Sequence, residues 1–563
     1  VPRARYALAA LAIVGILALY GWLLAPQLGK PFVYDDVNFA LGARAVAHTG
    51  LPYGNQGYLL HLYREREQWA LWHPPLYIYA LGLTTMLFGE SEAATRGLSV
   101  LCQLLAAGLS FDLARRLAGP GSVREPGGLV AGVLAVALFL LGPLTVQAAG
   151  ILDIDNTVLM LLTTLFVWVL IRLPDRWPRG TVAGLAIFYG LLLWAKLTTP
   201  LLLLAAMVFT RAFGSTGWRG ALEALTIGAL GWALFLVSWL VVTGLTGMPA
   251  DYTFIVVSRE ALESGTSTRD RFVSWAAFAA GAAPAVLWLG PFFCLLFVLA
   301  GLPRLWRLLR GRGLEPGDLV VVLGAAIYLV YIMKLAGSFP KYHAAMLPLW
   351  TAASGAAIVR AAGRPSWGQL AVMLVGFAAV FGWLQARADL WAIEWDPTLI
   401  RLLIVVPLLV GLAMGGLWAQ LGRVSPLRAA PISLAALALA WSLALNVHQR
   451  GLDGSTTYYY GRYGQVEAAR ALEDRLQPDE LYIASKEVAW YSRHQRYVDQ
   501  ESWQHVVWDL GQGFDGTWLD QPVRVLALEL GERSVRGTYE RALAPRYRPV
   551  GEYGNFVIFE RAT

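Results

Sequence analysis

The sequence predicts a polytopic α-helical membrane protein with a small C-terminal α/β domain outside the membrane. Of its 563 residues, 57% are hydrophobic and only 15% are charged, whereas soluble domains carry about 25% charged residues. The 23 Trp and 23 Tyr are of the type enriched at the lipid–water boundary. From residue 448 onward the charge rises and long apolar runs end, so we divide the chain into a membrane part, 1–447, and a soluble part, 448–563.

The basic net charge does not indicate nucleic-acid binding. The formal charge is +7, and arginines of membrane proteins concentrate in cytoplasmic loops, where they set the orientation of the chain. Cys102 and Cys294 both lie inside apolar runs, so no disulfide framework is implied.

About 13 apolar runs approach the length that crosses about 30 Å of hydrocarbon. Arg3 and Arg5 precede the first run, which we interpret as an uncleaved signal anchor with a cytoplasmic N-terminus. With this start, nearly every arginine cluster falls on the cytoplasmic side, as expected for a multi-pass protein of the cell (inner) membrane. The expected spans are 6–26, 96–118, 127–149, 154–173, 181–195, 197–213, 220–243, 276–300, 318–334, 343–362, 369–388, 398–421 and 429–447.

One further apolar stretch, 72–89, is expected to lie along the outer membrane surface. If it spanned the membrane, every later arginine cluster would move to the outer side. His73 is followed by two prolines, which fit the first turn of a helix and disfavour helix before it. We therefore expect an interfacial helix within a first outer loop, 27–95.

This first loop carries the strongest chemical signal. Asp35 and Asp36 can cap a short amphipathic helix that we expect to end at Gly50. Steps of four from Asp36 place Arg44 and His48 on the same helical face. Adjacent carboxylates repel, so one of them could act as a general base. The pair could instead share a divalent metal ion, or it could simply cap the helix in a solvated loop.

Basic residues at expected outer turns are candidates for binding a phosphate. His73 begins the interfacial helix, Lys196 separates two apolar runs, and Lys341 lies in an outer turn. Such a lysine either extends to the membrane interface or binds an anion, and isolated outer lysines are commonly just solvated. Several cations from separate turns would suit a lipid phosphate, and we assign this role to Arg44, His73, Lys196 and Lys341.

Three more residues could form an acceptor site or an additional site. Asp153 opens the run Asp-Ile-Asp-Asn at the start of an expected span, where a helix cap is the competing explanation. Tyr342 and His343 directly follow Lys341 at its outer turn. In the soluble part we expect a helix at 466–476 and strands at 480–485, 523–529 and 555–559.

Taken in chain order, these motifs resemble the GT-C glycosyltransferases. The shared features are an acid pair after the first span, a His-Pro-Pro-Leu-Tyr helix, an acidic residue at a later span, a lysine–threonine step and a soluble tail. Within that superfamily the chain looks most like the dolichyl-phosphate-mannose protein mannosyltransferase and aminoarabinose transferase group. The motifs cover residues 6–350, and the architecture covers the whole chain.

The resemblance implies sugar transfer from a polyprenyl-phosphate donor to a protein, lipid or polysaccharide acceptor on the outer face of the membrane. Asp35 and Asp36 would form the catalytic motif, which is often Asp-Glu in relatives. Some relatives have lysine where this chain has His73. The chemistry fits the residues: cations stabilise the departing phosphate, a carboxylate takes the acceptor proton, and attack opposite the phosphate would invert the anomeric centre.

Two other functions compete with glycosyl transfer. A transporter or flippase for lipid-linked glycans should have charged or broken spans near the middle of the membrane, and often repeated halves. Here the ionisable residues gather at span ends, and we find no internal repeat. A membrane-anchored glycan-binding or assembly protein would act through its tail, where Glu487, Arg493 and Asp499 form no recognisable site.

Overall fold

The computed structural model divides into two compact units. The first comprises 1–27, 99–241 and 255–452, and the second comprises 28–98, 242–254 and 453–563. The structure describes residues 2–32, 35–54, 69–119, 126–258, 289–335, 340–364, 366–386, 426–450, 463–494, 496–504, 523–531 and 533–562. The expected span 398–421 and most of the expected span 276–300 lie outside these residues.

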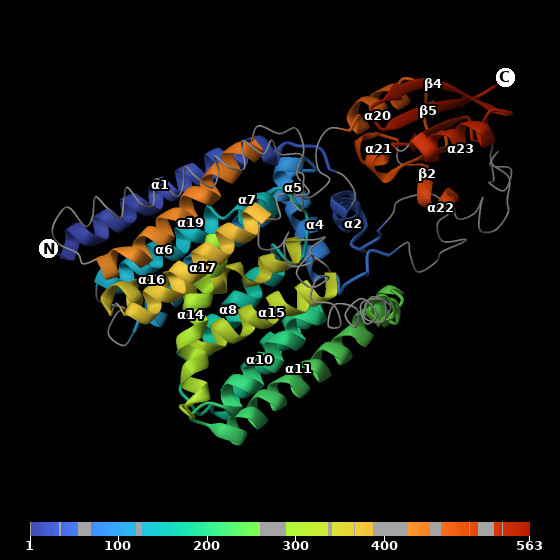
Figure 1. Cartoon of the computed structure of the whole chain (residues 1–563). Helices are drawn as coiled ribbons and strands as arrows, with labels where there is room; N and C mark the ends of the chain where they lie inside the picture. Colours follow the sequence, from blue (N-terminus) through green and yellow to red (C-terminus); the bar gives the residue numbers. More distant parts are fainter. Residues whose placement is uncertain are drawn as a thin grey trace. The chain divides into compact units, whose positions relative to one another are not determined.

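The first unit is built from helices, several of which are long and apolar (Figure 1). Within the described residues, six helices are long and apolar enough to cross a membrane, and a seventh crossing results if α6 and α7 form one bent span. The helices are α1 (Pro2–Leu28), α5 (Glu92–Leu117), α6 (Pro126–Leu140), α7 (Pro143–Ala149), α8 (Val158–Arg172), α9 (Arg179–Ala195), α10 (Thr198–Ala212), α11 (Gly217–Thr246), α14 (Pro291–Leu309), α15 (Leu319–Leu335), α16 (Leu347–Gly363), α17 (Trp367–Ala386) and α19 (Pro426–Arg450), with the 3₁₀ turns η1 (Pro316–Asp318) and η2 (Pro340–Met346). Helices α5 and α11 each run through both units.

The expected straight span 127–149 is bent. Its two halves, α6 and α7, meet at 55°. Gly142 lies at the bend, and Pro143 begins α7, where its fixed φ and missing N–H favour a new helix start. The Gly-Pro pair in the sequence is the signal that our single-span expectation overlooked.

Close helix packing in the first unit depends on a small residue. A Cβ at Gly355 of α16 would lie only 2.5 Å from the Ala131 carbonyl oxygen of α6, so glycine allows the two backbones to approach. Helix α1 lies beside α19 (Figure 1), where the Arg450 Nε donates to the Trp22 carbonyl at 3.2 Å.

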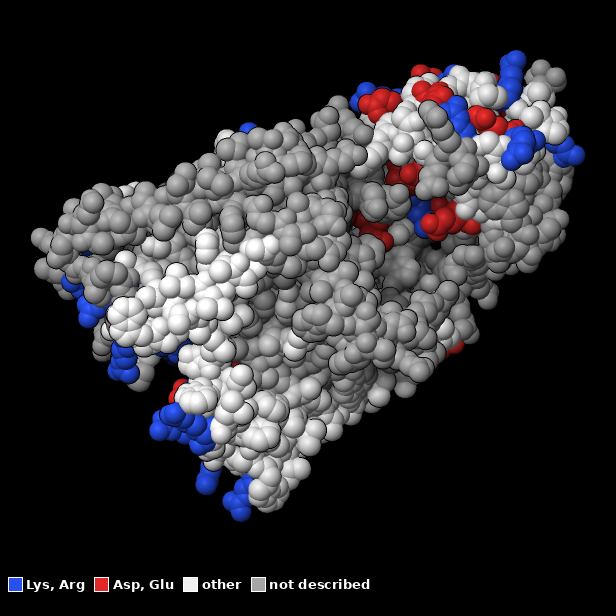
Figure 2. Space-filling model, viewed as in Figure 1, with Lys and Arg blue, Asp and Glu red and all other residues white. Residues whose placement is uncertain are grey.

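Several helices of the first unit end in arginine. Figure 2 shows Lys and Arg side chains gathered at one end of this unit. The last turns of α8, α10, α14 and α16 contain Arg172, Arg211, Arg307 and Arg360, respectively. A cation stabilises the partial negative charge at a helix C-terminus.

The second unit contains helices of the first loop and a five-stranded sheet from the end of the chain (Figure 1). The strand order is β2-β1-β3-β5-β4, with β1 parallel to β2 and β3, and β5 antiparallel to β3 and β4. Its elements are α2 (Asp35–Thr49), α4 (Leu76–Phe88), α20 (Gln465–Glu473), β1 (Tyr482–Ala484), α21 (Lys486–Tyr491), β2 (Tyr497–Asp499), α22 (Gln500–Gln504), β3 (Val525–Glu529), α23 (Arg533–Leu543), β4 (Tyr547–Tyr553) and β5 (Phe556–Arg561).

Alternate strand residues bury the two faces of this sheet in separate cores. Tyr482 of β1 belongs to the core that contains Leu472 of α20, whereas the neighbouring Ile483 belongs to the core that contains Tyr539 of α23. This alternation follows from the two-residue period of a strand. Strands β1, β3 and β5 overlap the ranges expected from sequence, whereas β2 and β4 were not expected.

Two acidic residues at the carboxyl ends of the parallel strands have raised pKa values. Burial raises the pKa of Asp499 to about 6, and burial together with the nearby carboxylates of Glu487 and Glu501 raises the pKa of Glu529 to about 7. An unfolded chain has a glutamate pKa near about 4.3. The folded state therefore holds more protons, and Glu529 contributes stability that is present below about pH 4.3 and is lost as the pH rises through about 7.

We expect wild type to lose stability relative to Glu529→Gln as the pH rises from 4.5 to 8, a range that contains the pKa of about 7. Thermal unfolding of the purified full chain, followed by intrinsic fluorescence, measures this difference. Glu480→Gln is the control. Burial opposes ionisation of Glu480, but hydrogen bonds from Arg524 outweigh it and lower the pKa. The stability difference between wild type and Glu480→Gln should therefore level off above the unfolded pKa of glutamate. A wild-type-minus-Glu529→Gln difference that stays constant with pH would contradict the prediction.

Candidate functional site

Helix α2 begins at the two aspartates and ends before Gly50, as the sequence predicts. Asp35 is exposed at the start of the helix, whereas Asp36 is 4% exposed. Gly50 has a φ of +76°, a conformation that glycine adopts without strain and that commonly ends a helix. The adjacent acids therefore occupy different environments, one facing solvent and one inside the protein.

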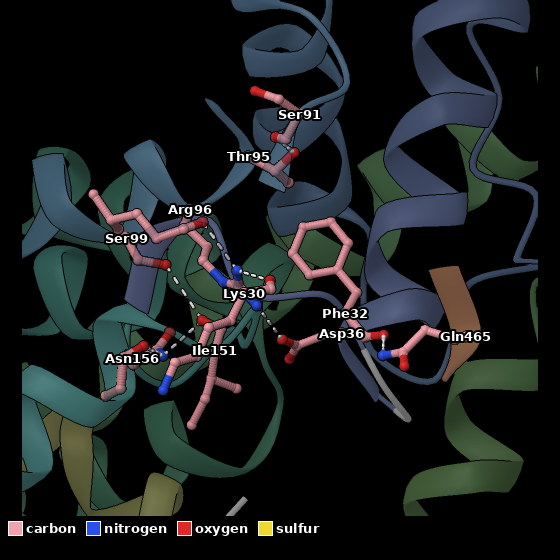
Figure 3. A network of polar contacts seen from close by, with 12 residues as sticks. Lys30, Phe32, Asp36, Ser91, Thr95, Arg96, Ser99, Ile151, Asn156 and Gln465 are labelled. Atoms are coloured by element: carbon pink, nitrogen blue, oxygen red, sulfur yellow. Dashed lines mark hydrogen bonds and ion pairs between the residues drawn. The ribbon is translucent and has the colours of Figure 1, made fainter. Parts of the chain in front are cut away.

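The buried acid faces Arg96, which is not among the predicted site residues. An Arg96 Nη2 lies 3.5 Å from the Asp36 Oδ2, and the Arg96 side chain is 0% exposed. Its Nη1 donates to the carbonyl oxygens of Leu28, at 3.0 Å, and Lys30. Figure 3 shows the guanidinium directed toward Lys30 and Asp36. Arg96 thus holds both the acid and the chain that leads into α2.

Phe32 lies between these contacts and the C-terminal part of the second unit, α20 to β5 (465–561), which we call the sheet domain. The Arg96 guanidinium lies over the Phe32 ring at 4.7 Å. The Phe32 N–H donates to the Tyr491 hydroxyl at 2.7 Å, and its carbonyl accepts from the Gln465 amide at 3.4 Å (Figure 3). The sheet domain therefore contacts the chain close to the acids.

Arg44 and His48 share one acidic partner, Glu90. The Arg44 Nε lies 2.8 Å from one Glu90 oxygen, and the His48 Nε2 lies 3.0 Å from the other. Arg44 Nη2 also donates to the Trp490 carbonyl at 3.0 Å, and the guanidinium stacks 3.7 Å from the Trp490 ring centroid. Burial lowers the pKa of Arg44, although Glu90 opposes this effect. Arg44 Nη1 has no hydrogen-bond partner within the described residues.

His73 lies half-buried in the turn before α4. Helix α4 has 13 residues, which corresponds to about 20 Å and is shorter than a hydrocarbon core of about 30 Å. Phe39 of α2 makes edge-on contacts with Trp72, at 5.9 Å, and Tyr77, at 5.1 Å. Aromatic packing therefore joins the His73 turn to the acid helix.

A second polar cluster lies in the first unit and brings together residues from three predicted turns. Lys341 Nζ is 2.7 Å from Asp153 Oδ2, and Lys196 Nζ is 2.5 Å from Asp155 Oδ2. Asp155 N–H donates to Asp153 Oδ1 at 2.9 Å. Each lysine is only 3% exposed. Each of these buried charges therefore has an oppositely charged partner, as buried charges require.

Tyr342 joins the two halves of this cluster. Lys196 Nζ lies 4.8 Å and Lys341 Nζ lies 5.6 Å from the centre of its ring. His343 is buried and packs its ring against Tyr328 at 5.4 Å. Nearby, the Asn156 amide donates to the Ile151 carbonyl at 3.1 Å, and Ser99 donates to the same carbonyl at 3.5 Å (Figure 3).

The acid pair does not fit a resident metal ion well. Asp36 faces a fully buried guanidinium, and its positive charge would repel a nearby cation. Among the described residues, no group of three or more His, Cys, Asp or Glu side chains is placed to hold a metal ion.

Lys196, Lys341 and Asp153 are predicted site residues, whereas Asp155, Arg96 and Glu90 are not. Asp155 has the two-residue spacing to Asp153 as a signal, and Arg96 is an arginine at the outer end of an expected span. Both signals are visible in the sequence, but neither identifies the partner side chain. The assignments of Arg44, His73 and both lysines to a phosphate remain predictions.

Comparisons with known proteins agree with the sequence motifs. The sequence pattern of the dolichyl-phosphate-mannose-protein mannosyltransferase family matches residues 72–242. ArnT from Cupriavidus metallidurans bound to undecaprenyl phosphate is similar in structure, with a TM-score of 0.61, 18% sequence identity and coverage of 98% of both chains. Its apo structure has a TM-score of 0.59 and 18% identity, over 99% of this chain and 98% of that one. A search of curated protein sequences gives no significant match.

These matches show that 98% of the chain shares the fold of ArnT and that residues 72–242 carry the mannosyltransferase pattern. They confirm the resemblance to the polyprenyl-phosphate-dependent GT-C glycosyltransferases that the motifs indicate.

Proposed function

We propose that this chain, a GT-C-type glycosyltransferase, moves a sugar from a polyprenyl-phosphate donor to an acceptor on the outer face of the cell membrane. The observation that carries the proposal is the start of α2, where exposed Asp35 adjoins buried Asp36 and its partner Arg96. The structure of ArnT with undecaprenyl phosphate supports a lipid phosphate as the donor group.

In this proposal the two acids have different roles. Asp35, which is exposed, takes the proton from the acceptor hydroxyl or amine. The acceptor atom then forms a bond to the anomeric carbon, the bond from that carbon to the phosphate oxygen breaks, and the electron pair stays on the polyprenyl phosphate. Attack from the opposite face inverts the anomeric centre. Asp36, fixed beside Arg96, orients the start of the helix.

Cations compensate the charge that develops on the departing phosphate. We assign this role to Arg44, His73, Lys196 and Lys341, and support comes from the Arg44 Nη1, which has no hydrogen-bond partner within the described residues. The two lysines already have carboxylate partners, so a phosphate would compete with Asp153 and Asp155 for them. Asp153, Tyr342 and His343 are our candidates for contacts to the acceptor.

The proposed orientation places the N-terminus in the cytoplasm and the sheet domain outside. It is supported by the arginines at the ends of α8, α10, α14 and α16, since cytoplasmic loops carry the excess of positive charge. The exposed apolar residues Leu83, Leu87 and Phe88 of α4 suit a helix that lies in the membrane interface.

Sugar release from short-chain polyprenyl-phosphate sugars tests this function. Purified wild type is incubated with each donor and either water or a crude envelope extract as acceptor, with and without a chelator. We expect donor consumption that the chelator leaves unchanged, because the buried guanidinium beside Asp36 disfavours a metal ion there. Loss of activity on chelation, restored by a divalent cation, would contradict the metal-independent mechanism. No consumption of any donor with any acceptor extract would contradict the function.

A further inference from the structure

The chain just before the acid helix is held by residues that lie 433 and 459 positions later. Phe32, which is fully buried, precedes Asp35 by three residues. Its N–H is bound by Tyr491 and its carbonyl by Gln465, both from the sheet domain. Both the donor and the acceptor of the Phe32 backbone are therefore bonded to the sheet domain, three residues before Asp35.

Tyr491 is placed to join two segments of the first loop. Its hydroxyl accepts the Phe32 N–H at 2.7 Å and lies near enough to the Glu92 carboxylate for that charge to affect its pKa. Burial, and then the Glu92 charge, raise the pKa of Tyr491, so the hydroxyl stays protonated and can donate. Glu92 begins α5, and Arg96, the partner of Asp36, follows one turn later on the same helix.

Trp490 makes a parallel set of contacts. Its ring meets the Phe32 ring edge-on at 5.6 Å and lies 3.7 Å from the Arg44 guanidinium. Its carbonyl accepts from the same guanidinium at 3.0 Å. Consecutive residues of α21 therefore contact the entry to α2 and its second half.

We propose that Trp490 and Tyr491 are positioning residues for the acid pair, so that the sheet domain completes the transferase site. This inference rests on the proposed function of Asp35 and Asp36. The short helix α21 follows β1 at the edge where parallel strands end, the edge that α/β sheets use for binding. In this chain Trp490 and Tyr491, the last two residues of α21, contact the first loop of the same chain.

Tyr491→Phe in the full chain tests the proposal. The variant leaves the Phe32 N–H without its acceptor, and we expect kcat to fall by about tenfold. The KM for the donor should stay unchanged, because no donor contact is removed. Hydrogen–deuterium exchange at the Phe32 amide should become faster. Tyr547→Phe is the matched control, since it removes a buried hydroxyl that bonds only within the sheet domain, to Val523.

Variants at two further positions protect the test against misfolding. Trp490→Tyr keeps an aromatic face for Arg44 and should retain most activity, whereas Trp490→Leu should lose as much as Tyr491→Phe. Gln465→Met removes the bond to the Phe32 carbonyl and should also lower kcat. Wild-type kcat in Tyr491→Phe and Gln465→Met, or a loss matched by Tyr547→Phe, overturns the inference. If the positioning inference fails but Asp35→Asn is inactive in the same assay, the proposed function still stands. If Asp35→Asn is fully active, both the positioning inference and the proposed role of the acid pair are wrong.

Discussion

Asp35→Asn should abolish most sugar transfer without unfolding the protein. A positioned general base contributes about 10²–10⁴-fold to a rate, and asparagine cannot take the acceptor proton. Because Asp35 is exposed at the first position of α2, its neutral isostere should cost little stability. Donor turnover by purified protein, with thermal unfolding measured on the same samples, shows whether activity and stability separate.

Asp36→Asn should give a different signature. It leaves the fully buried Arg96 without its carboxylate, and breaking a buried pair on one side is strongly destabilising. We therefore expect both activity and melting temperature to fall. Asp474→Asn, which changes an exposed acid of the sheet domain, is the control and should match wild type. Full donor turnover in Asp35→Asn would remove the proposed base, and an unchanged melting temperature in Asp36→Asn would contradict its pairing with Arg96.

Lys196→Met should destabilise the first unit by about 3–5 kcal/mol, because it leaves a buried carboxylate unpaired. Asp155 is fully buried, and its partner lysine lies 2.5 Å away. The double variant Lys196→Met with Asp155→Leu removes both charges, so most of the stability should return. Chemical unfolding of Lys196→Met, Asp155→Leu and the double variant beside wild type measures the coupling between the two residues.

The same double variant separates the structural role of Lys196 from its proposed role in donor binding. If the lysine also binds the phosphate, the double variant is stable but has a higher KM for the donor. Arg304→Met is the matched control, since it breaks a buried pair with Asp318 at 2.6 Å that we place outside the site; it should lower stability and leave the KM unchanged. A stable double variant with a wild-type KM would exclude Lys196 as a phosphate contact.

Local signals in the sequence predict the start and end of the acid helix. Two aspartates and a later glycine identify α2, and a His-Pro-Pro step identifies the start of α4. These features depend on neighbours in the chain, because capping, proline geometry and positive φ are local effects. The turn at Lys196 between α9 and α10 is predicted for the same reason.

The partners of the site residues could not be predicted in the same way. Arg44 belongs to a helical face that the sequence reveals, but its contacts with Glu90 and Trp490 depend on how distant segments pack. Asp153 and Lys341 are separately visible as candidates, yet a single sequence cannot show that they neutralise each other. Strand β2 has only three residues, too few for an alternating pattern, whereas the equally short β1 lies in the continuous apolar run 481–484.

The bond between Phe32 and Tyr491 has a consequence for how the enzyme is made. The ribosome must add 459 residues after Phe32 before its partner exists, which takes about 20–90 s at ordinary rates of synthesis. During that time the nascent chain already has its acid pair but lacks the contacts that fix it. If Tyr491 positions the acids as proposed, full activity begins only after the sheet domain has been synthesised and folded, and chains that end before Tyr491 should transfer sugar more slowly.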